Sequence, residues 1–236
     1  MERLAAPRLA VVHDARRRVV AGGAQRQAPR PRGPRQLGDA VKGVTGGNSA
    51  GDFLKLLGNG RDFGLKHLSY TYQQGEGGIA DALRLAEHFA DDGPLCVVLG
   101  DNLIEGNIAK AAEAFRVQKK GAKILLKDVK DPQRFGVPHL EGNRVVSIEE
   151  KPARPRSSYA VTGIYFYDAR VFEITRTLKP SGRGELEITD VNNAYIASGE
   201  LTWDVLDGWW TDAGTIESLL AANQLVAQTG ANRMEL

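Results

Sequence analysis

Residues 68–101 read LSYTYQQGEGGIADALRLAEHFADDGPLCVVLGD, and this stretch decides the fold. LSYTYQ alternates and is rich in aromatic and β-branched residues, so it predicts a strand. The next segment, IADALRLAEHFADD, predicts a helix with one apolar face, made by Ile79, Leu83, Ala86 and Phe89. PLCVVLGD is a continuous apolar run of strand length. Strand, helix and strand in this order predict a parallel sheet with crossover helices.

The rest of the chain continues the alternation. SAGDFLKLLGNG predicts a short helix closed by glycine, and IAKAAEAFRVQKKG followed by AKILL predicts a helix and a strand. RVVSIEEKP and YAVTGIYFYD predict strands, GELEITDVNNAYIASG a helix, LTWDVLDGWW strand-like sequence and TIESLLAANQLVAQTG a final helix. We therefore expect an α/β fold, with a mixed, mostly parallel sheet flanked by helices and extended by antiparallel strands.

Composition narrows the class of protein. With 236 residues, 42% apolar and 25% charged, the chain resembles an ordinary soluble protein of one large or two small domains. The single cysteine, Cys96, excludes an intramolecular disulfide and fits a reducing compartment. No apolar stretch is long enough to span a bilayer, and the N-terminus lacks the apolar segment of a signal peptide. We expect a cytoplasmic protein that does not bind membranes.

Residues 1–42 differ from the rest. They are rich in arginine and contain Pro29, Pro31 and Pro34, which disfavour regular helix and central strand. Only LAVVHD, residues 9–14, has the pattern of a short strand. A poorly ordered basic tail fits this composition. An arm that binds nucleic acid is the alternative, but no aromatic residues are interleaved to stack on bases, so we expect no nucleic-acid partner.

Two aspartates are candidate metal ligands. Asp101 stands where an apolar strand ends, the place where open α/β sheets bind ligands. Phosphate-bound Mg²⁺ takes one or two protein carboxylates, and Asp212 in WWTDAGT is the natural second one. A helix cap for Asp101 and a turn for Asp212 are the structural alternatives. No histidine lies at metal-ligand spacing to another, and no nucleophile motif is present.

Two further motifs have a chemical and a structural interpretation. In IEEKP, Glu149, Glu150 and Lys151 end a strand, and Pro152 should hold the preceding lysine extended. Such a lysine suits a phosphate and a neighbouring carboxylate suits sugar hydroxyls, whereas a solvated charge run is the alternative. GEGGIADA has the small residues of a phosphate-binding loop before a helix, but a plain strand-to-helix turn has the same pattern.

The order of the motifs is more specific than any one of them. VTGG, YQQGEGGIADAL, VVLGDN, FGV, IEEKP, YAVTGIYFYD, GELEITDVN and WTDAGT, from about Val44 to Gln228, resemble glucose-1-phosphate thymidylyltransferases and related nucleotidyltransferases. The resemblance implies a Rossmann-like sheet of the nucleotide-diphospho-sugar transferase type over residues 43–236. It also implies that dTTP and glucose 1-phosphate react with Mg²⁺ present to give dTDP-glucose and pyrophosphate, and that the chain forms a homo-oligomer.

The same resemblance assigns roles to the reacting end of the site. Gln73 and Gly78 would hold the thymine base. Asp101 and Asp212 would bind the catalytic Mg²⁺, and Lys151 would contact the sugar phosphate, so that Asp101 and Lys151 are the implied catalytic residues. In-line attack on the nucleotide α-phosphorus needs positioning and charge neutralisation rather than a covalent intermediate.

The sugar would be held by a second set of matching positions. Gly136 would contact the sugar and Glu150 its hydroxyls. Thr162 and Gly163 would line the sugar pocket, with Trp210 nearby.

The N-terminus departs from the family pattern. The family opens with a central strand, a glycine-rich loop of the form Gly-Gly-x-Gly-x-Arg-x-x-Pro and a lysine in Lys-x-x-x-Pro, whereas here residues 21–24 read AGGA and the first lysine is Lys42. One hypothesis is that residues 1–42 come from a shifted reading frame, and we expect the first family strand to be missing. The alternative is a catalytically impaired relative that binds nucleotide or sugar phosphate.

Overall fold

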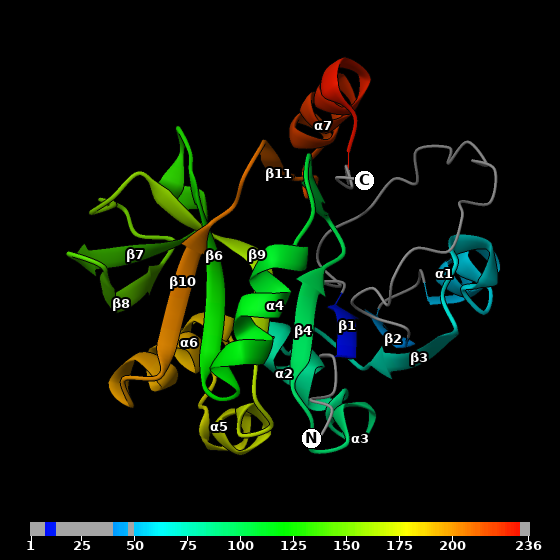
Figure 1. Ribbon diagram of the computed structural model, residues 1–236, viewed down its shortest axis with the longest axis horizontal. Coiled ribbons are helices and arrows are strands. Elements are labelled where there is room, and N and C mark those ends of the chain that lie inside the picture. The colour runs from blue at the N-terminus through cyan, green and yellow to red at the C-terminus, as the bar shows by residue number, and fades with distance from the viewer. Residues whose placement is uncertain (1–7, 13–39, 47–49, 232–236) are drawn as a thin grey trace.

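The structure is a computed structural model and describes residues 8–12, 40–46 and 50–231. In these ranges a seven-stranded sheet has the order β10-β6-β9-β4-β1-β2-β3 (Figure 1). Its strands are β1 Arg8–Val12, β2 Ala40–Gly46, β3 His67–Gln73, β4 Leu95–Leu99, β6 Ala122–Asp128, β9 Tyr159–Tyr167 and β10 Leu201–Val205. Neighbouring strands are parallel except at β9, which runs antiparallel to both β4 and β6. The predicted α/β class with a mixed, mostly parallel sheet is confirmed.

A strand does occupy the centre of the sheet. β1 pairs in parallel with β2 on one side and with β4 on the other. The expectation that the central strand is missing is therefore wrong, because the short apolar run near residues 9–14 supplies one. The proline cluster and the AGGA sequence lie outside the described residues.

The sequence suggested that several antiparallel strands extend the main sheet, and the structure arranges these strands differently. One of them, β9, lies inside it, and four others form two separate two-stranded sheets. These are β5 Asn102–Ile104 with β11 Trp210–Asp212, and β7 Gly136–Glu141 with β8 Arg144–Glu150. In Figure 1 the β7–β8 hairpin lies beside β10, at the opposite end of the sheet from β3.

Helices cover both faces of the sheet. They are α1 Ala50–Leu57, α2 Ile79–Arg84, α3 Glu87–Ala90, α4 Ala109–Gln118, α5 Val171–Thr177, α6 Ile188–Ala197 and α7 Ile216–Thr229, with short 3₁₀ turns η2 Arg61–Phe63 and η3 Pro132–Arg134. Among the helices of the described ranges, none is both long and apolar enough to cross a bilayer.

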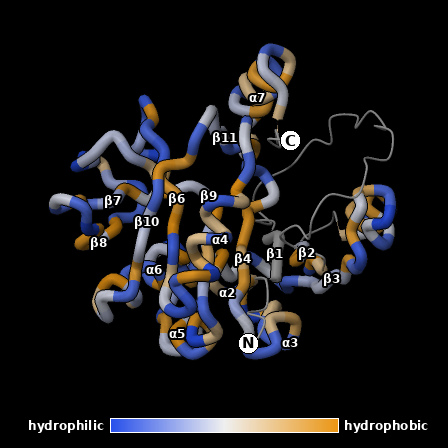
Figure 2. The backbone as a smooth tube through the Cα atoms, in the orientation of Figure 1, coloured by the Kyte–Doolittle hydropathy of each residue, from blue (hydrophilic) through white to orange (hydrophobic). Residues whose placement is uncertain are grey.

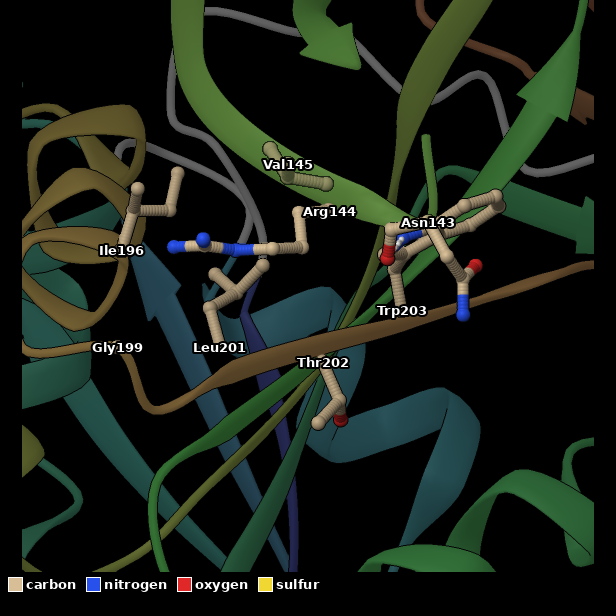
Figure 3. A pocket seen from close by; sticks show the side chains of 8 residues that line it. All are labelled: Asn143, Arg144, Val145, Ile196, Gly199, Leu201, Thr202 and Trp203. Carbon is tan, nitrogen blue, oxygen red and sulfur yellow. Dashed lines mark hydrogen bonds between the residues drawn. The ribbon is translucent and has the colours of Figure 1, made fainter. Parts of the chain in front are cut away.

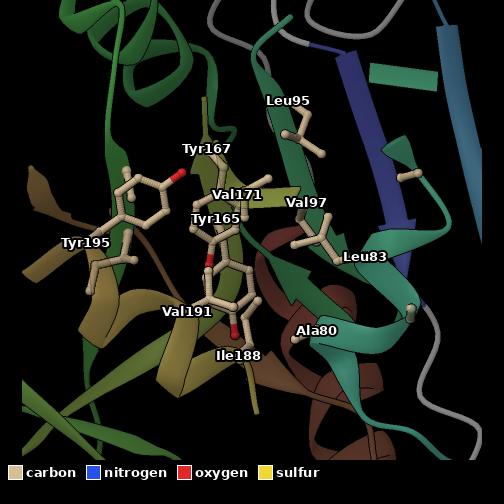
Figure 4. Close-up of a cluster of buried hydrophobic side chains, with 14 of the residues drawn as sticks. Ala80, Leu83, Leu95, Val97, Tyr165, Tyr167, Val171, Ile188, Val191 and Tyr195 are labelled. Carbon is tan, nitrogen blue, oxygen red and sulfur yellow. The ribbon is translucent and has the colours of Figure 1, made fainter. Parts of the chain in front are cut away.

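The core has two layers, one on each side of the sheet. Buried side chains of α2, α5 and α6 pack on one face, including Leu83, Val171 and Tyr195 (Figure 4). Phe115 of α4 belongs to the cluster on the other face. Hydrophobic segments lie along β4 and β6 in Figure 2. Because β9 alternates its side chains between the two clusters, eight of its nine residues are buried.

The single helix predicted from Ile79 onward is divided into α2 and α3. The N–H groups of Leu85 and Ala86 bond three residues back, to the carbonyls of Ala82 and Leu83, so the chain makes a tighter turn between the helices. The apolar period continues across the turn, which explains why the sequence predicted one helix.

Candidate active site

Two buried aspartates meet at the carboxyl edge of the central sheet. Asp101 follows the end of β4, and β5 begins at the next residue, Asn102. β11 pairs with β5 so that Asp212 lies opposite Asn102, and the Ala213 N–H donates to the Asp101 carbonyl at 2.7 Å. Asp101 and Asp212 are each only 6% exposed. The structure thus places the two aspartates that the sequence marked as candidate ligands on adjacent backbone segments.

Asn102 connects this carboxylate pair to β9 and to Trp210. Its Oδ1 accepts from the Trp210 Nε1–H at 2.6 Å and from the Gly163 N–H at 2.9 Å. Its Nδ2 donates to Asp101 Oδ1 at 2.8 Å. The bond to Nδ2 orients the carboxylate, and the two bonds to Oδ1 orient the amide. Asn102 belongs to the motif VVLGDN, but the sequence did not indicate that it contacts Trp210 and Gly163.

Arg134 is a site residue that the sequence analysis missed. Its Nη2 lies 3.3 Å from Asp212 Oδ1, while its Nη1 donates to Asp131 at 2.8 Å. The guanidinium stands over the Phe135 ring at 5.3 Å, and Phe135 meets the Trp210 indole edge-on, with ring centroids 5.1 Å apart. Arg134 directly precedes the FGV motif, and this position was the one sequence feature that could have indicated it as a site residue.

The carboxylates of Asp101 and Asp212 suit a hard divalent cation whose remaining ligands are water and phosphate oxygens. Asp101 and Asp212 are nearly buried, lie on adjacent backbone segments, and provide the oxygen ligands that such a cation prefers. Within the described ranges no group of three or more His, Cys, Asp or Glu side chains is arranged to hold a metal. Mg²⁺ bound to a phosphate needs only one or two protein carboxylates, so Asp101 and Asp212 fit it.

Glu150 is the centre of a second polar group. It pairs in register with Gly136 across the β7–β8 hairpin. The Thr189 hydroxyl donates to Glu150 Oε2 at 2.6 Å, while Arg183 Nη2 and Lys151 Nζ lie 3.5 Å and 3.8 Å from Oε1. A carboxylate held between a hydroxyl and two cations keeps a fixed orientation.

Arg183 and Thr189 were not predicted as site residues. The hydrogen bond from Arg183 to Glu187, 2.8 Å long, raises the pKa of the guanidinium. The motif GELEITDVN pointed to this part of the chain. It did not identify Arg183, which precedes the motif, or show that Thr189 contacts Glu150.

Lys151 has a backbone conformation that the sequence did not predict. Its φ is +46°, in the left-handed region, whereas a residue before proline was expected to be extended. The Lys151 N–H donates to the Phe135 carbonyl at 3.0 Å, which fixes the chain just beyond the end of β8. A non-glycine residue in this region costs about 1–2 kcal/mol, and such residues cluster at functional sites.

Gln73 and Gly78 lie together at the end of β3. Gln73 is 4% exposed, and its Nε2 donates to the Gly78 carbonyl at 3.0 Å and to Asp81 Oδ2 at 2.8 Å. Gly78 has φ +91°, and a Cβ there would lie 2.6 Å from the Leu186 carbonyl oxygen. The glycine is therefore needed for backbone packing, which supports the structural interpretation of the GEGG turn.

Thr162 and Gly163 face different surroundings. Thr162 is fully buried, and its hydroxyl donates to the Leu125 carbonyl at 2.9 Å. The Thr162 hydroxyl therefore uses its donor in a hydrogen bond within the sheet. Gly163 lies against the side-chain amide of Asn102, so of the two residues it is the one next to the asparagine that bonds Asp101. The predicted role of both in a sugar pocket stays a prediction.

Two connections link the polar groups. The Phe135 ring meets Trp210, which lies beside Asp212, edge-on, and the Phe135 carbonyl accepts from the N–H of Lys151, which lies beside Glu150. The segment before α6 contacts the turn that follows Gln73, because the Leu186 N–H donates to the Gly77 carbonyl at 2.8 Å. Residues from β3, β4, β8 and β11 thus converge, although they are far apart in the sequence.

A cavity of about 160 Å³ lies elsewhere, between the turn of the β7–β8 hairpin, the end of α6 and the start of β10 (Figure 3). Arg144, Leu201 and Trp203 are among its lining residues. It is separate from the polar groups described above.

The fold agrees with comparisons to known proteins. The family model for nucleotidyl transferases matches residues 39–229, so the chain belongs to the nucleotidyl transferase family.

Curated relatives carry a more specific name. The glucose-1-phosphate thymidylyltransferase of Neisseria meningitidis is 44% identical over 187 residues, covering 78% of this chain and 65% of its own length. That of Actinoplanes is 43% identical over 182 residues, covering 76% and 60%. The chain thus spans less than two thirds of these relatives.

Solved structures with a similar fold are also nucleotidyltransferases of this type. A Bacillus anthracis protein assigned as a glucose-1-phosphate thymidylyltransferase, in complex with a sucrose, has a TM-score of 0.74 and 47% identity, covering 84% of this chain and 79% of its own. A UDP-glucose pyrophosphorylase complexed with UDP-glucose has a TM-score of 0.66 at 19% identity over 80% of each chain. The second likeness supports the nucleotide-diphospho-sugar transferase fold alone.

Proposed function

We propose that the chain joins dTTP and glucose 1-phosphate to give dTDP-glucose and pyrophosphate. The observation that carries the proposal is the meeting of Asp101 and Asp212 at one edge of the sheet, connected through Phe135 to the Glu150–Lys151 group. The names of the relatives at 43–44% identity support the same reaction and the same substrates.

The residues of the chain position and neutralise the reactants. Gln73 binds the base, Glu150 orients the sugar through its hydroxyls, and Lys151 neutralises the sugar phosphate as a point charge. Asp101 and Asp212 hold Mg²⁺, with Asn102 keeping the first carboxylate in place. The metal, when bound, neutralises charge on the nucleotide phosphates. In-line attack of this kind is accelerated by positioning the two substrates and by neutralising the charge on their phosphates.

The proposal includes three properties of the whole protein. The reaction takes place in the cytoplasm, which fits the buried free thiol of Cys96. The chain assembles as a homo-oligomer, a point for light scattering to test. Residues 1–42 are an atypical Arg- and Pro-rich segment of sequence before the nucleotidyltransferase domain of residues 43–236, but β1 and the start of β2, which lie in that segment, belong to the domain's main sheet. Sequencing the coding DNA upstream of Val44 tests the shifted-frame hypothesis.

Pyrophosphate release by the full chain with Mg²⁺, dTTP and glucose 1-phosphate tests the reaction. Asp101→Asn should reduce the rate about 100-fold or more, and chelation of the metal should do the same. Asp62→Asn on the exposed η2 turn is the matched control and should leave the rate unchanged. A folded chain that binds nucleotide and releases no pyrophosphate would refute the proposed activity and favour an impaired relative.

A further inference from the structure

The side-chain amide of Gln73 is fixed in one orientation. Its nitrogen faces the Gly78 carbonyl at 3.0 Å and Asp81 Oδ2 at 2.8 Å. Both partners are oxygens that only accept hydrogen bonds, so the NH₂ group must face them. Turning the amide over would place its own oxygen against two acceptors.

This orientation leaves Gln73 with a single kind of hydrogen-bonding group to offer a ligand. An amide NH₂ has two N–H donors, and the hydrogen bonds to Gly78 and Asp81 use both. The remaining polar atom is Oε1, an acceptor. Because the residue is only 4% exposed, its side chain has little freedom to rearrange when a ligand arrives.

Asp81 is the side chain that enforces the orientation. It lies in the first turn of α2, and a Cβ on Gly77 would lie only 2.5 Å from its Oδ2, so the absence of a side chain at Gly77 leaves the space that Asp81 uses. Arg84 Nη1 stands 4.0 Å from the other carboxylate oxygen. The second tether of Gln73 is a backbone carbonyl, which no substitution of a side chain removes.

We propose that Asp81 is a positioning residue that makes the base site select pyrimidines with a ring N–H, such as thymine, over cytosine. The inference rests on the proposed function, in which Gln73 meets the base. The Oε1 acceptor complements the N3–H of thymine, whereas N3 of cytosine is itself an acceptor and would face it unpaired. Cytosine would fit only with a reversed amide, which Asp81 and the Gly78 carbonyl oppose. Sites built on such a contact discriminate strongly because the mismatch leaves buried polar groups unpaired.

The test is the ratio of dissociation constants of the full chain for dCTP and dTTP with Mg²⁺, measured by calorimetry. Asp81→Asn keeps the shape, but its amide can present either a donor or an acceptor to Gln73. We expect the wild-type chain to favour dTTP about 100-fold or more, and Asp81→Asn to lower the ratio about 10-fold. Asp81→Ala should lower it as well, because only the carbonyl then opposes reversal. Asp52→Asn, an exposed aspartate in the first turn of α1, is the matched control.

Binding without turnover separates this inference from the proposed reaction. A chain that discriminates dTTP from dCTP through Asp81 and releases no pyrophosphate would sustain the inference and refute the activity. Pyrophosphate release with an unchanged binding ratio in both folded Asp81 variants would sustain the activity and overturn the inference. A chain that binds neither nucleotide would overturn both. Circular dichroism and urea unfolding establish that each variant is folded.

Discussion

Replacing Gly163 by alanine should dislodge the side chain that orients the aspartate pair. A Cβ at this position would lie 2.5 Å from Asn102 Nδ2 and 2.8 Å from its Cγ and Oδ1. Such contacts do not occur in real proteins, so Asn102 must move. When it moves, it gives up its bonds to the Gly163 N–H, the Trp210 indole and the Asp101 carboxylate.

The expected cost follows from these three bonds. Two of them join neutral groups, at about 0.5–1.5 kcal/mol each, and the one to Asp101 involves a charge, at about 1.5–3 kcal/mol. Asn102 is only half-buried, so water replaces part of what is lost. Gly163 lies inside β9 and has no positive φ, so no backbone strain is added. We expect the free energy of unfolding to fall by about 2–4 kcal/mol.

Urea unfolding followed by circular dichroism measures this cost. The control is a double-mutant cycle with Asn102→Ala, which removes the atoms that collide with the new methyl group. Gly163→Ala should add little in that background, giving a coupling energy of about 2 kcal/mol. Additive effects, or a single-mutant cost under about 0.5 kcal/mol, would show that Asn102 does not have the role assigned to it.

Three further substitutions test other parts of the structure. Tyr195→Phe removes a buried hydroxyl that donates to Asp168 Oδ1 at 2.7 Å, and should cost about 1.5–3 kcal/mol in urea unfolding. Gly78→Ala places a side chain at φ +91° and 2.6 Å from a backbone carbonyl oxygen, so it should cost about 3 kcal/mol or more, measured in the same way. The hydrogen bond from Arg170 lowers the pKa of Glu200, so the glutamate stabilises the fold above the ordinary glutamate pKa, and this contribution is lost as pH falls through the lowered value. The stability difference between the wild-type chain and Glu200→Gln should therefore shrink as pH falls from about 5 to below the ordinary glutamate pKa of about 4.3, and a difference that grows would contradict the assignment.

The elements of the fold were largely predictable from local pattern. Apolar runs and amphipathic segments located most strands and helices, because burial of one or both faces leaves a period in the sequence. Asp101 was recognisable for the same reason, since it follows an apolar strand and ligands bind at strand ends. Asp212 was found through its motif, and its position opposite β5 came only from the structure.

The features that escaped prediction depend on the arrangement of the chain in space. YAVTGIYFYD predicted a buried strand, but an apolar run carries no information about strand direction or place in the sheet. Arg134 meets Asp212 across 78 residues of sequence, and Asn102 meets Trp210 across 108. The left-handed Lys151 contradicts its local preference, because a tertiary hydrogen bond holds its backbone.

The place of β9 has a consequence for the order of events during synthesis. β4 pairs with β1, made earlier, and with β9, made about sixty residues later, whereas the partners of β6 in the described part of the chain are β9 and β10, which both follow it. The ribosome therefore releases β6 as an apolar strand before any partner in this sheet exists. Contacts of such long sequence separation form slowly, and unpaired strand edges promote aggregation. A chain truncated before Tyr159 would expose β4 and β6 together, so solubility during expression should depend on how quickly β9 emerges.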